Sequence, residues 1–240
     1  MKPKVLFIGS IGAVAETSEI QRQSYNQALK ENGVDWEWDI DVYKQLLQSN
    51  GGQDRLSTLT AATNQNLSEE TIEKIHARKT ELAGEKIIAD KIKPRAGLVD
   101  LITAAKKEDV KIAWVTTTGH ENTDAILEAF DGAITADHFD HIFHREDAVN
   151  GKPASDIYHA ALKKFDMEPV DCIAVEDSLN SLLAAKAAGI FTVVAQGAYH
   201  DEPVNNIADV VVDSLEQTSW LKIRKAFEKV HSNARKPSES

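Results

Sequence analysis

The chain has 240 residues, of which 42% are hydrophobic and 27% charged, the composition of a folded globular protein rather than a disordered one. Its formal net charge of −11 argues against a general nucleic-acid binder, which presents a basic surface. No apolar run approaches the roughly 18 residues of a membrane span, and the run near the start is too short for a signal peptide. Because the single cysteine, Cys172, fits a reducing compartment, we expect a cytoplasmic protein.

Short apolar runs alternate with helix-period segments along most of the chain, which predicts an α/β fold with a parallel sheet. The predicted strands are residues 5–8, 111–115, 172–175, 191–195 and 209–212. The predicted helices between and after them are residues 97–107, 121–130, 155–166, 178–188 and 215–230. Residues 137–144 carry three histidines, but their aromatic and aliphatic neighbours favour an edge strand over a zinc site.

The stretch from about residue 18 to residue 92 interrupts this alternation with helical patterns alone. Ser18 is expected to cap the first of these helices and Gly33 to end it, while Ser68 begins the last in capping style. We therefore predict a core formed by residues 1–17 and 93–240, with a helical cap, residues 18–92, inserted between them. The further helices expected in the cap are residues 39–47, 54–62 and 68–89.

Four short motifs follow predicted strands, where an open α/β sheet binds its ligands. They are residues 9–13, 116–119, 151–158 and 175–180. The second has threonine hydroxyls and amides before a helix, where an anion can bind. The third contains Lys152, and the fourth contains the adjacent carboxylates Glu176 and Asp177, with Ser178 available to cap the next helix. Each motif alone is weak, but their order and shared position are specific.

With these motifs in this order, the chain resembles the haloacid dehalogenase superfamily, most of all the subgroup of β-phosphoglucomutase and the CbbY-type sugar-bisphosphate phosphatases. The resemblance implies a Rossmann-like core with a parallel sheet and a mobile helical cap. It also implies that a small phosphorylated metabolite, rather than nucleic acid or a membrane, is the partner. By resemblance, the phosphate-binding residues are Thr116, Thr117 and Lys152, the magnesium ligands are Glu176 and Asp177, and the substrate-binding residues are Glu16, Gly51, Gly52 and Arg55.

The first motif departs from the family pattern Asp-x-Asp-Gly-Thr-Leu. Aligning residues 15–17, Ala-Glu-Thr, with the segment that follows this motif in CbbY-type proteins puts Gly9 at the nucleophile and Ile11 at the general acid. Both catalytic carboxylates are then absent. Because the nucleophile is also a metal ligand in the family, Mg²⁺ binding remains possible but is weakened. Ser10 is not expected to substitute, because neighbours on an extended strand point to opposite faces.

Two functions remain open. In the first, the chain binds a phosphorylated sugar or a similar anion with little or no standard phosphatase activity. In the second, it is an active sugar-phosphate phosphohydrolase with a rearranged, metal-assisted site. A third, purely structural interpretation is that Lys152 simply pairs with Asp177. The sequence indicates neither the ligand, the oligomeric state nor a protein partner.

Overall fold

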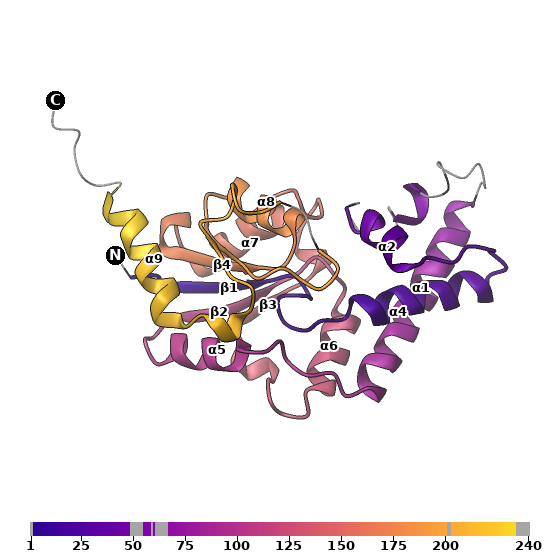
Figure 1. The fold of residues 1–240 in the computed structure, drawn as a ribbon, viewed down its shortest axis with the longest axis horizontal. Coiled ribbons are helices and arrows are strands. Elements are labelled where there is room, and N and C mark those ends of the chain that lie inside the picture. Colours follow the sequence, from indigo (N-terminus) through magenta and orange to yellow (C-terminus); the bar gives the residue numbers. More distant parts are fainter. Residues whose placement is uncertain (1, 49–54, 59, 61–66, 201–202, 234–240) are drawn as a thin grey trace.

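The computed structural model describes residues 2–48, 55–58, 60, 67–200 and 203–233, and within them the chain builds a parallel sheet between helices (Figure 1). The strand order is β3-β2-β1-β4-β5-β6. Every adjacent pair of strands is parallel, which confirms the predicted α/β class. The strands are β1 (Val5–Gly9), β2 (Lys111–Val115), β3 (His141–Phe143), β4 (Cys172–Glu176), β5 (Phe191–Val194) and β6 (Val210–Val211).

The helices of the core follow the predicted segments within a few residues, except at the C-terminal end. There the predicted segment 215–230 starts with a short 3₁₀ turn, and the helix itself begins only at Trp220. The histidine-rich segment contributes edge strand β3, as its aromatic residues predicted. The core helices are α5 (Leu98–Lys106), α6 (His120–Ala129), α7 (Asp156–Phe165), α8 (Leu179–Ala187) and α9 (Trp220–Asn233).

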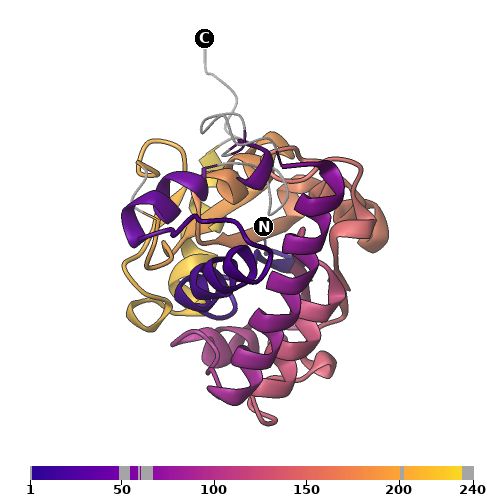
Figure 2. The ribbon, with the colours of Figure 1, turned by 90° about the vertical axis from the view of Figure 1, so that its right-hand side faces the viewer.

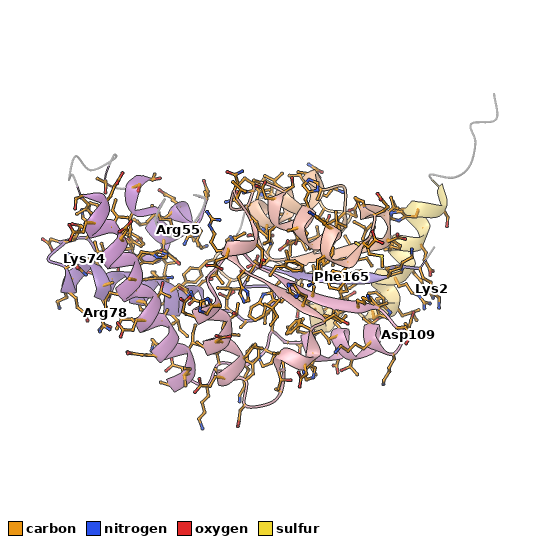
Figure 3. All side chains as sticks on the ribbon, turned by 180° about the vertical axis from the view of Figure 1, so that it is seen from behind. Lys2, Arg55, Lys74, Arg78, Asp109 and Phe165 are labelled. Atoms are coloured by element: carbon orange, nitrogen blue, oxygen red, sulfur yellow. The ribbon has the colours of Figure 1, made fainter. Side chains whose placement is uncertain are left out.

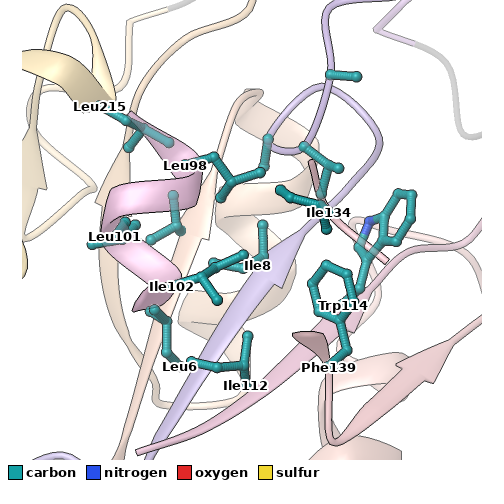
Figure 4. Packing of buried hydrophobic residues seen from close by; sticks show 14 of the residues in the cluster. Leu6, Ile8, Leu98, Leu101, Ile102, Ile112, Trp114, Ile134, Phe139 and Leu215 are labelled. Atoms are coloured by element: carbon teal, nitrogen blue, oxygen red, sulfur yellow. The ribbon is translucent and has the colours of Figure 1, made fainter. Parts of the chain in front are cut away.

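The two faces of the sheet carry separate apolar cores because side chains alternate along each strand. On β1, Leu6 and Ile8 join the core beneath α5 and α9, whereas Val5 and Phe7 join the core beneath α7 and α8. Figure 4 shows the first of these cores, with Leu6 and Ile8 close to α5. Every residue of β1 is buried, so its carboxyl end is rigidly placed at the centre of the sheet.

Three of the helices between β1 and α5 pack around an apolar cluster of their own, which includes Tyr25, Trp38 and Tyr43. They are α1 (Ser18–Glu31), α2 (Ile40–Leu46) and α4 (Glu69–Ala89), and α4 runs alongside α6 of the core (Figure 2). Part of the segment predicted as helix 54–62 lies outside the described residues, and the boundaries of the cap stay a prediction. Among the described residues, no helix is long and apolar enough to cross a membrane.

The start of α1 differs from the prediction. Thr17, not Ser18, stands at the N-cap, and its side chain makes no capping hydrogen bond. Instead, the Ser18 N–H donates to Glu16 Oε1 at 2.9 Å. Ser68 and Ser178 do cap α4 and α8, where their hydroxyls accept from Thr71 N and Ser181 N.

Gly97 lies where the chain returns from α4 to the core, and its φ is +84°. A Cβ there would lie 2.5 Å from backbone atoms of Leu215 and Glu216. Gly33 has a similar φ of +71° but open space around it.

We expect Gly33→Ala to cost roughly 1–2 kcal/mol of unfolding free energy, from backbone strain alone. Gly97→Ala should cost about 1–3 kcal/mol more than Gly33→Ala, because the backbone of Leu215 and Glu216 must move. Urea unfolding of both variants tests this; equal costs would contradict it.

Candidate functional site

The motif loops meet at the carboxyl ends of three neighbouring strands. β1 ends at Gly9, β2 is followed by Thr116, and β4 ends at Glu176. Since β1 pairs with β2 on one side and with β4 on the other, the first motif lies between the other two. Most of the residues predicted from the four motifs are thereby brought to one edge of the sheet.

The carboxyl group of Glu176 occupies the space beside Gly9. Glu176 follows Val175, which pairs with Ile8, so Glu176 and Gly9 are neighbours that face the same side of the sheet. A Cβ added to Gly9 would overlap all three atoms of the Glu176 carboxyl group. The place where a side chain of residue 9 would begin is therefore filled by the end of the Glu176 side chain.

Two other buried groups hold the Glu176 carboxyl in this position. Lys152 Nζ lies 3.1 Å from Glu176 Oε1, and the Tyr158 hydroxyl donates to the same oxygen. Glu176 is fully buried and Lys152 is 7% exposed. Burial raises the pKa of the Glu176 carboxyl, and Lys152 and Tyr158 oppose that rise. Glu176 Oε2 is buried without a hydrogen-bond partner, so one oxygen of the group has unused bonding capacity.

The predicted alternative in which Lys152 pairs with Asp177 is wrong, because Lys152 pairs with Glu176. The reason is the face of the sheet: Glu176 points toward α7, which carries Tyr158 and follows the Lys152 loop. The Lys152 ammonium also donates to the Val115 carbonyl at 3.1 Å. Lys152 is thus anchored between β2 and β4.

Asp177 is bound by serines instead. Ser10 Oγ lies 2.5 Å from Asp177 Oδ1, and Ser181 Oγ donates to the same oxygen at 3.3 Å. The expectation that Ser10 faces away from the site is therefore wrong. It assumed that the strand continues through residue 10, but β1 ends at Gly9 and Ser10 has a φ of +47°. This left-handed turn brings the hydroxyl back to the end of β4.

The loop after β2, predicted to bind an anion, lies between β2 and α6. Thr116 is 2% exposed, and its hydroxyl accepts the Thr118 N–H at 3.2 Å. Thr117 is half-buried, and α6 begins shortly afterwards at His120. Ile11 stands at the position where the resemblance places the general acid. Its alkyl side chain packs against the apolar core beneath α5.

The predicted substrate-binding residues are only partly described. Glu16 Oε2 accepts the Ala198 N–H at 2.7 Å, and since Glu16 Oε1 holds the start of α1, this carboxylate ties two loops at the mouth of the site. Arg55 Nε donates to the Leu46 carbonyl at 3.1 Å, in the part of the cap that borders the core (Figure 3). Gly51 and Gly52 lie outside the described residues.

Sequence reasoning missed a buried cation in the cap. Lys79 on α4 is 7% exposed and its ammonium lies 4.9 Å from the centre of the Tyr25 ring. Burial, with a smaller contribution from Arg55, lowers the pKa of Lys79 to about 7. The signal was present in the sequence, because Lys79 falls four residues after Ile75 and three before Leu82, on the apolar stripe of α4.

The described residues contain no cluster of three or more histidine, cysteine or acidic side chains placed to hold a metal ion. In the predicted pair of metal ligands, Glu176 Oε1 already accepts from Lys152 and Tyr158. Asp177 Oδ1 accepts from Ser10 and Ser181. The second oxygen of each carboxylate, Glu176 Oε2 and Asp177 Oδ2, is therefore the one that could bind a metal ion. Magnesium is commonly held by one or two carboxylates together with water and phosphate oxygens. The donor set fits an ion that arrives with a phosphate better than a resident one.

The comparisons with known proteins agree with this architecture. A family model described as a haloacid dehalogenase-like hydrolase matches residues 6–189. CbbY of Cereibacter sphaeroides is 35% identical over 212 residues, which are 88% of this chain and 91% of that protein. CbbY of Cupriavidus necator is 38% identical over 188 residues, which are 76% of this chain and 74% of that protein.

Among solved structures, a mutant of CbbY from Rhodobacter sphaeroides in complex with xylulose-(1,5)bisphosphate matches with a TM-score of 0.86 and 33% identity, covering 93% of this chain and 99% of that chain. CbbY from the same organism in complex with phosphate matches with the same TM-score and identity, covering 94% and 100%. The likeness to β-phosphoglucomutase of Clostridium difficile, with a TM-score of 0.80 at 19% identity, is one of fold; it covers 96% of this chain and 99% of that chain.

The tight fit of Glu176 over Gly9 predicts the effect of adding one methyl group. Gly9→Ala should cost roughly 1–3 kcal/mol of unfolding free energy, because the Glu176 carboxyl must leave its buried hydrogen bonds. Gly119→Ala is the matched control, since its Cβ would meet only the carboxylate of Glu121, which is 64% exposed and can swing away. Denaturant unfolding should show a smaller cost for the control, about 0.5 kcal/mol, which is the loss expected when alanine replaces glycine at the N-cap of α6. Equal costs would show that the Glu176 carboxyl is not fixed there.

The buried Lys79 predicts a stability that rises with pH. Between its folded pKa of about 7 and its ordinary value of 10.5, the unfolded chain binds a proton that the folded chain does not, so folding becomes more favourable as the pH increases across this window. Below pH 7 the full cost of burying the charge is present. Lys79→Met should therefore raise the unfolding free energy at pH 7 by about 1–3 kcal/mol and flatten its rise toward pH 10.

Lys74→Met on the same helix is the control, because the Lys74 side chain is 65% exposed. It should change neither the stability nor its pH dependence by more than a few tenths of a kcal/mol. A destabilised Lys79→Met variant would contradict the interpretation of Lys79 as a buried, uncompensated charge.

Proposed function

Because this chain belongs to the haloacid dehalogenase-like hydrolase family, we propose that it binds a phosphorylated sugar or a similar phosphate-bearing metabolite, with little or no phosphatase activity through an aspartyl-phosphate. The observation that carries the second part is the Glu176 carboxyl in the space beside Gly9. By resemblance the attacking carboxylate belongs at residue 9, and there the chain has a bare backbone.

The anion-binding part of the proposal rests on groups around the end of β2. Thr116 and Thr117 precede the N-terminus of the ten-residue helix α6, where backbone amides and the helix dipole favour an anion. Lys152 is anchored to the Val115 carbonyl directly before them. A phosphate placed here would share the Lys152 ammonium with Glu176.

The similarity to CbbY narrows the ligand class. CbbY from Rhodobacter sphaeroides binds phosphate in one structure and xylulose-(1,5)bisphosphate in another. A bisphosphate carries a second anion, and Arg55 of the cap is the cation proposed to meet it. Glu16 is exposed, and its carboxylate, which already accepts the Ser18 and Ala198 N–H groups, can also accept hydrogen bonds from sugar hydroxyls.

Magnesium enters the proposal only together with the phosphate. Glu176 and Asp177 would hold it through their two available oxygens, and bound there it would neutralise phosphate charge and polarise the P–O bonds. The chain's own contribution is to fix both carboxylates through Lys152, Tyr158, Ser10 and Ser181. Mg²⁺ affinity should therefore depend on phosphate.

The second candidate function, an active sugar-phosphate phosphohydrolase with a rearranged, metal-assisted site, is favoured by one observation. Glu176 Oε2 is a buried oxygen without a partner, which is the kind of group that a metal ion would satisfy.

For either function we propose a cytoplasmic location, since the single cysteine, Cys172, is buried and free. Turnover of a sugar-phosphate panel separates the two candidates.

Titration calorimetry with inorganic phosphate and a panel of sugar phosphates, with and without Mg²⁺, tests the proposal. We expect binding at or below millimolar concentration and phosphate release near the uncatalysed background. Removing the Lys152 ammonium should weaken phosphate binding roughly 10- to 100-fold, the effect of a lost charge-assisted hydrogen bond. No binding at millimolar phosphate would rule the proposal out.

Lys152→Met alone is unsuitable for this test, because it leaves the Glu176 charge buried and unpaired. It should lower the unfolding free energy by about 3–5 kcal/mol. The double variant Lys152→Met/Glu176→Gln removes both charges together. Lys186→Met is the matched control, because Lys186 pairs with Asp209 at 2.9 Å near the opposite end of β5. It should leave phosphate affinity unchanged.

A further inference from the structure

Ser10 adopts a backbone conformation that its surroundings impose. Its φ of +47° lies in the left-handed region, which a serine adopts at a cost. Its N–H donates to the Val115 carbonyl at 3.0 Å, and its carbonyl accepts from the buried Trp114 Nε1 at 2.9 Å. Two residues of β2 thus fix both sides of Ser10. Strained residues held in this way are concentrated at functional sites.

The strained backbone directs the Ser10 hydroxyl at a carboxylate that is itself held in place. Ser10 Oγ lies 2.5 Å from Asp177 Oδ1, and Ser181 Oγ approaches the same oxygen at 3.3 Å. Asp177 is 5% exposed, and Gly12 leaves room for it, since a Cβ at Gly12 would overlap Asp177 Oδ2. A hydroxyl beside a base, with a third group orienting the base, is the arrangement of an activated nucleophile.

The anion-binding groups converge on the same place. The Ser10 N–H and the Lys152 ammonium both donate to one acceptor, the Val115 carbonyl. Thr116 follows Val115 directly. A phosphoryl group bound by Thr116 and Lys152 would therefore lie next to the turn that carries Ser10, a half-buried residue.

We propose that Ser10 is a phosphoryl acceptor, a nucleophile that replaces the carboxylate missing at residue 9. This rests on the proposed function, because the donor must first occupy the anion site. The Ser10 Oγ–P bond forms as the ester O–P bond of the donor breaks. The hydroxyl proton passes to Asp177 Oδ1, and the leaving oxygen takes a proton from water.

The surroundings of Ser10 also determine how long the phosphoserine lasts. Hydrolysis requires a water molecule to attack phosphorus, and a nearby acid or base speeds that attack. By resemblance that group belongs at residue 11, where Ile11 packs against the core instead. With Asp177 carrying the serine proton and no second acid–base group at residue 11, hydrolysis of the phosphoserine is slower than its formation, and turnover stays low.

Acetyl phosphate is the best donor for the test, because its leaving group, acetate, needs no proton. The full chain is incubated with acetyl phosphate and Mg²⁺, and intact mass and peptide mapping locate any phosphoryl group. We expect one group per chain, on Ser10, and resistance to hydroxylamine, which cleaves acyl phosphates but not phosphoserine. The urea-unfolded chain should not react.

Ser10→Gly is the decisive variant, because glycine accepts the positive φ and lacks the hydroxymethyl side chain. It should fold and acquire no phosphoryl group. Ser24→Ala, on α1 with its hydroxyl bonded to the Ile20 carbonyl at 2.8 Å, should react as the wild type does.

The outcomes are distinct. A wild-type chain that binds inorganic phosphate but remains unmodified would overturn the Ser10 proposal and leave the proposed function intact. A hydroxylamine-sensitive group on Glu176 or Asp177, or an adduct that survives in Ser10→Gly, would also overturn it. If the chain neither binds phosphate nor reacts, both proposals fail.

Discussion

The contact between the Glu176 carboxyl and the backbone of Gly9 determines what this site can do. It exists because β1 and β4 are adjacent and in register, so that both residues point to the same face of the sheet. It persists because Lys152 and Tyr158 satisfy the same carboxyl oxygen in a region closed to water. Removing one partner of such a buried pair leaves an uncompensated charge, so the three side chains form one unit.

These three side chains, Glu176, Lys152 and Tyr158, change the chemistry available at the carboxyl edge of the sheet. By resemblance the space beside residue 9 belongs to an attacking carboxylate, and here the carboxyl of a metal-binding motif lies in it. The Lys152 ammonium, which by resemblance would bind phosphate oxygens, is partly neutralised by the same group. Threonine hydroxyls, a helix N-terminus and a shared ammonium remain at this edge, and the proposal that the chain holds a phosphate rather than cleaves it rests on them. The hydroxyl of Ser10 is the group best placed to react.

The sequence was sufficient to predict the elements but not their contacts. The alternation of buried strands and amphipathic helices located β1, β2, β4 and β5 within a residue or two, because parallel strands buried on both faces leave a clear apolar signature. It could not decide which neighbour Lys152 would choose, since Glu176 and Asp177 are adjacent in the chain and only the sheet register separates them. Ser10 was misplaced because its turn depends on Trp114 and Val115, which are remote in sequence. Lys79 was overlooked although it interrupts an apolar stripe.

A crystal structure of the chain grown with phosphate and Mg²⁺ tests the central claim most directly. The account predicts that the Glu176 carboxyl remains against Gly9, with one oxygen still bonded to Lys152 and Tyr158, and that phosphate lies beside Thr116. A Glu176 side chain turned away from Gly9, with its contacts to Lys152 and Tyr158 broken and a fully coordinated ion in the vacated space, would contradict it.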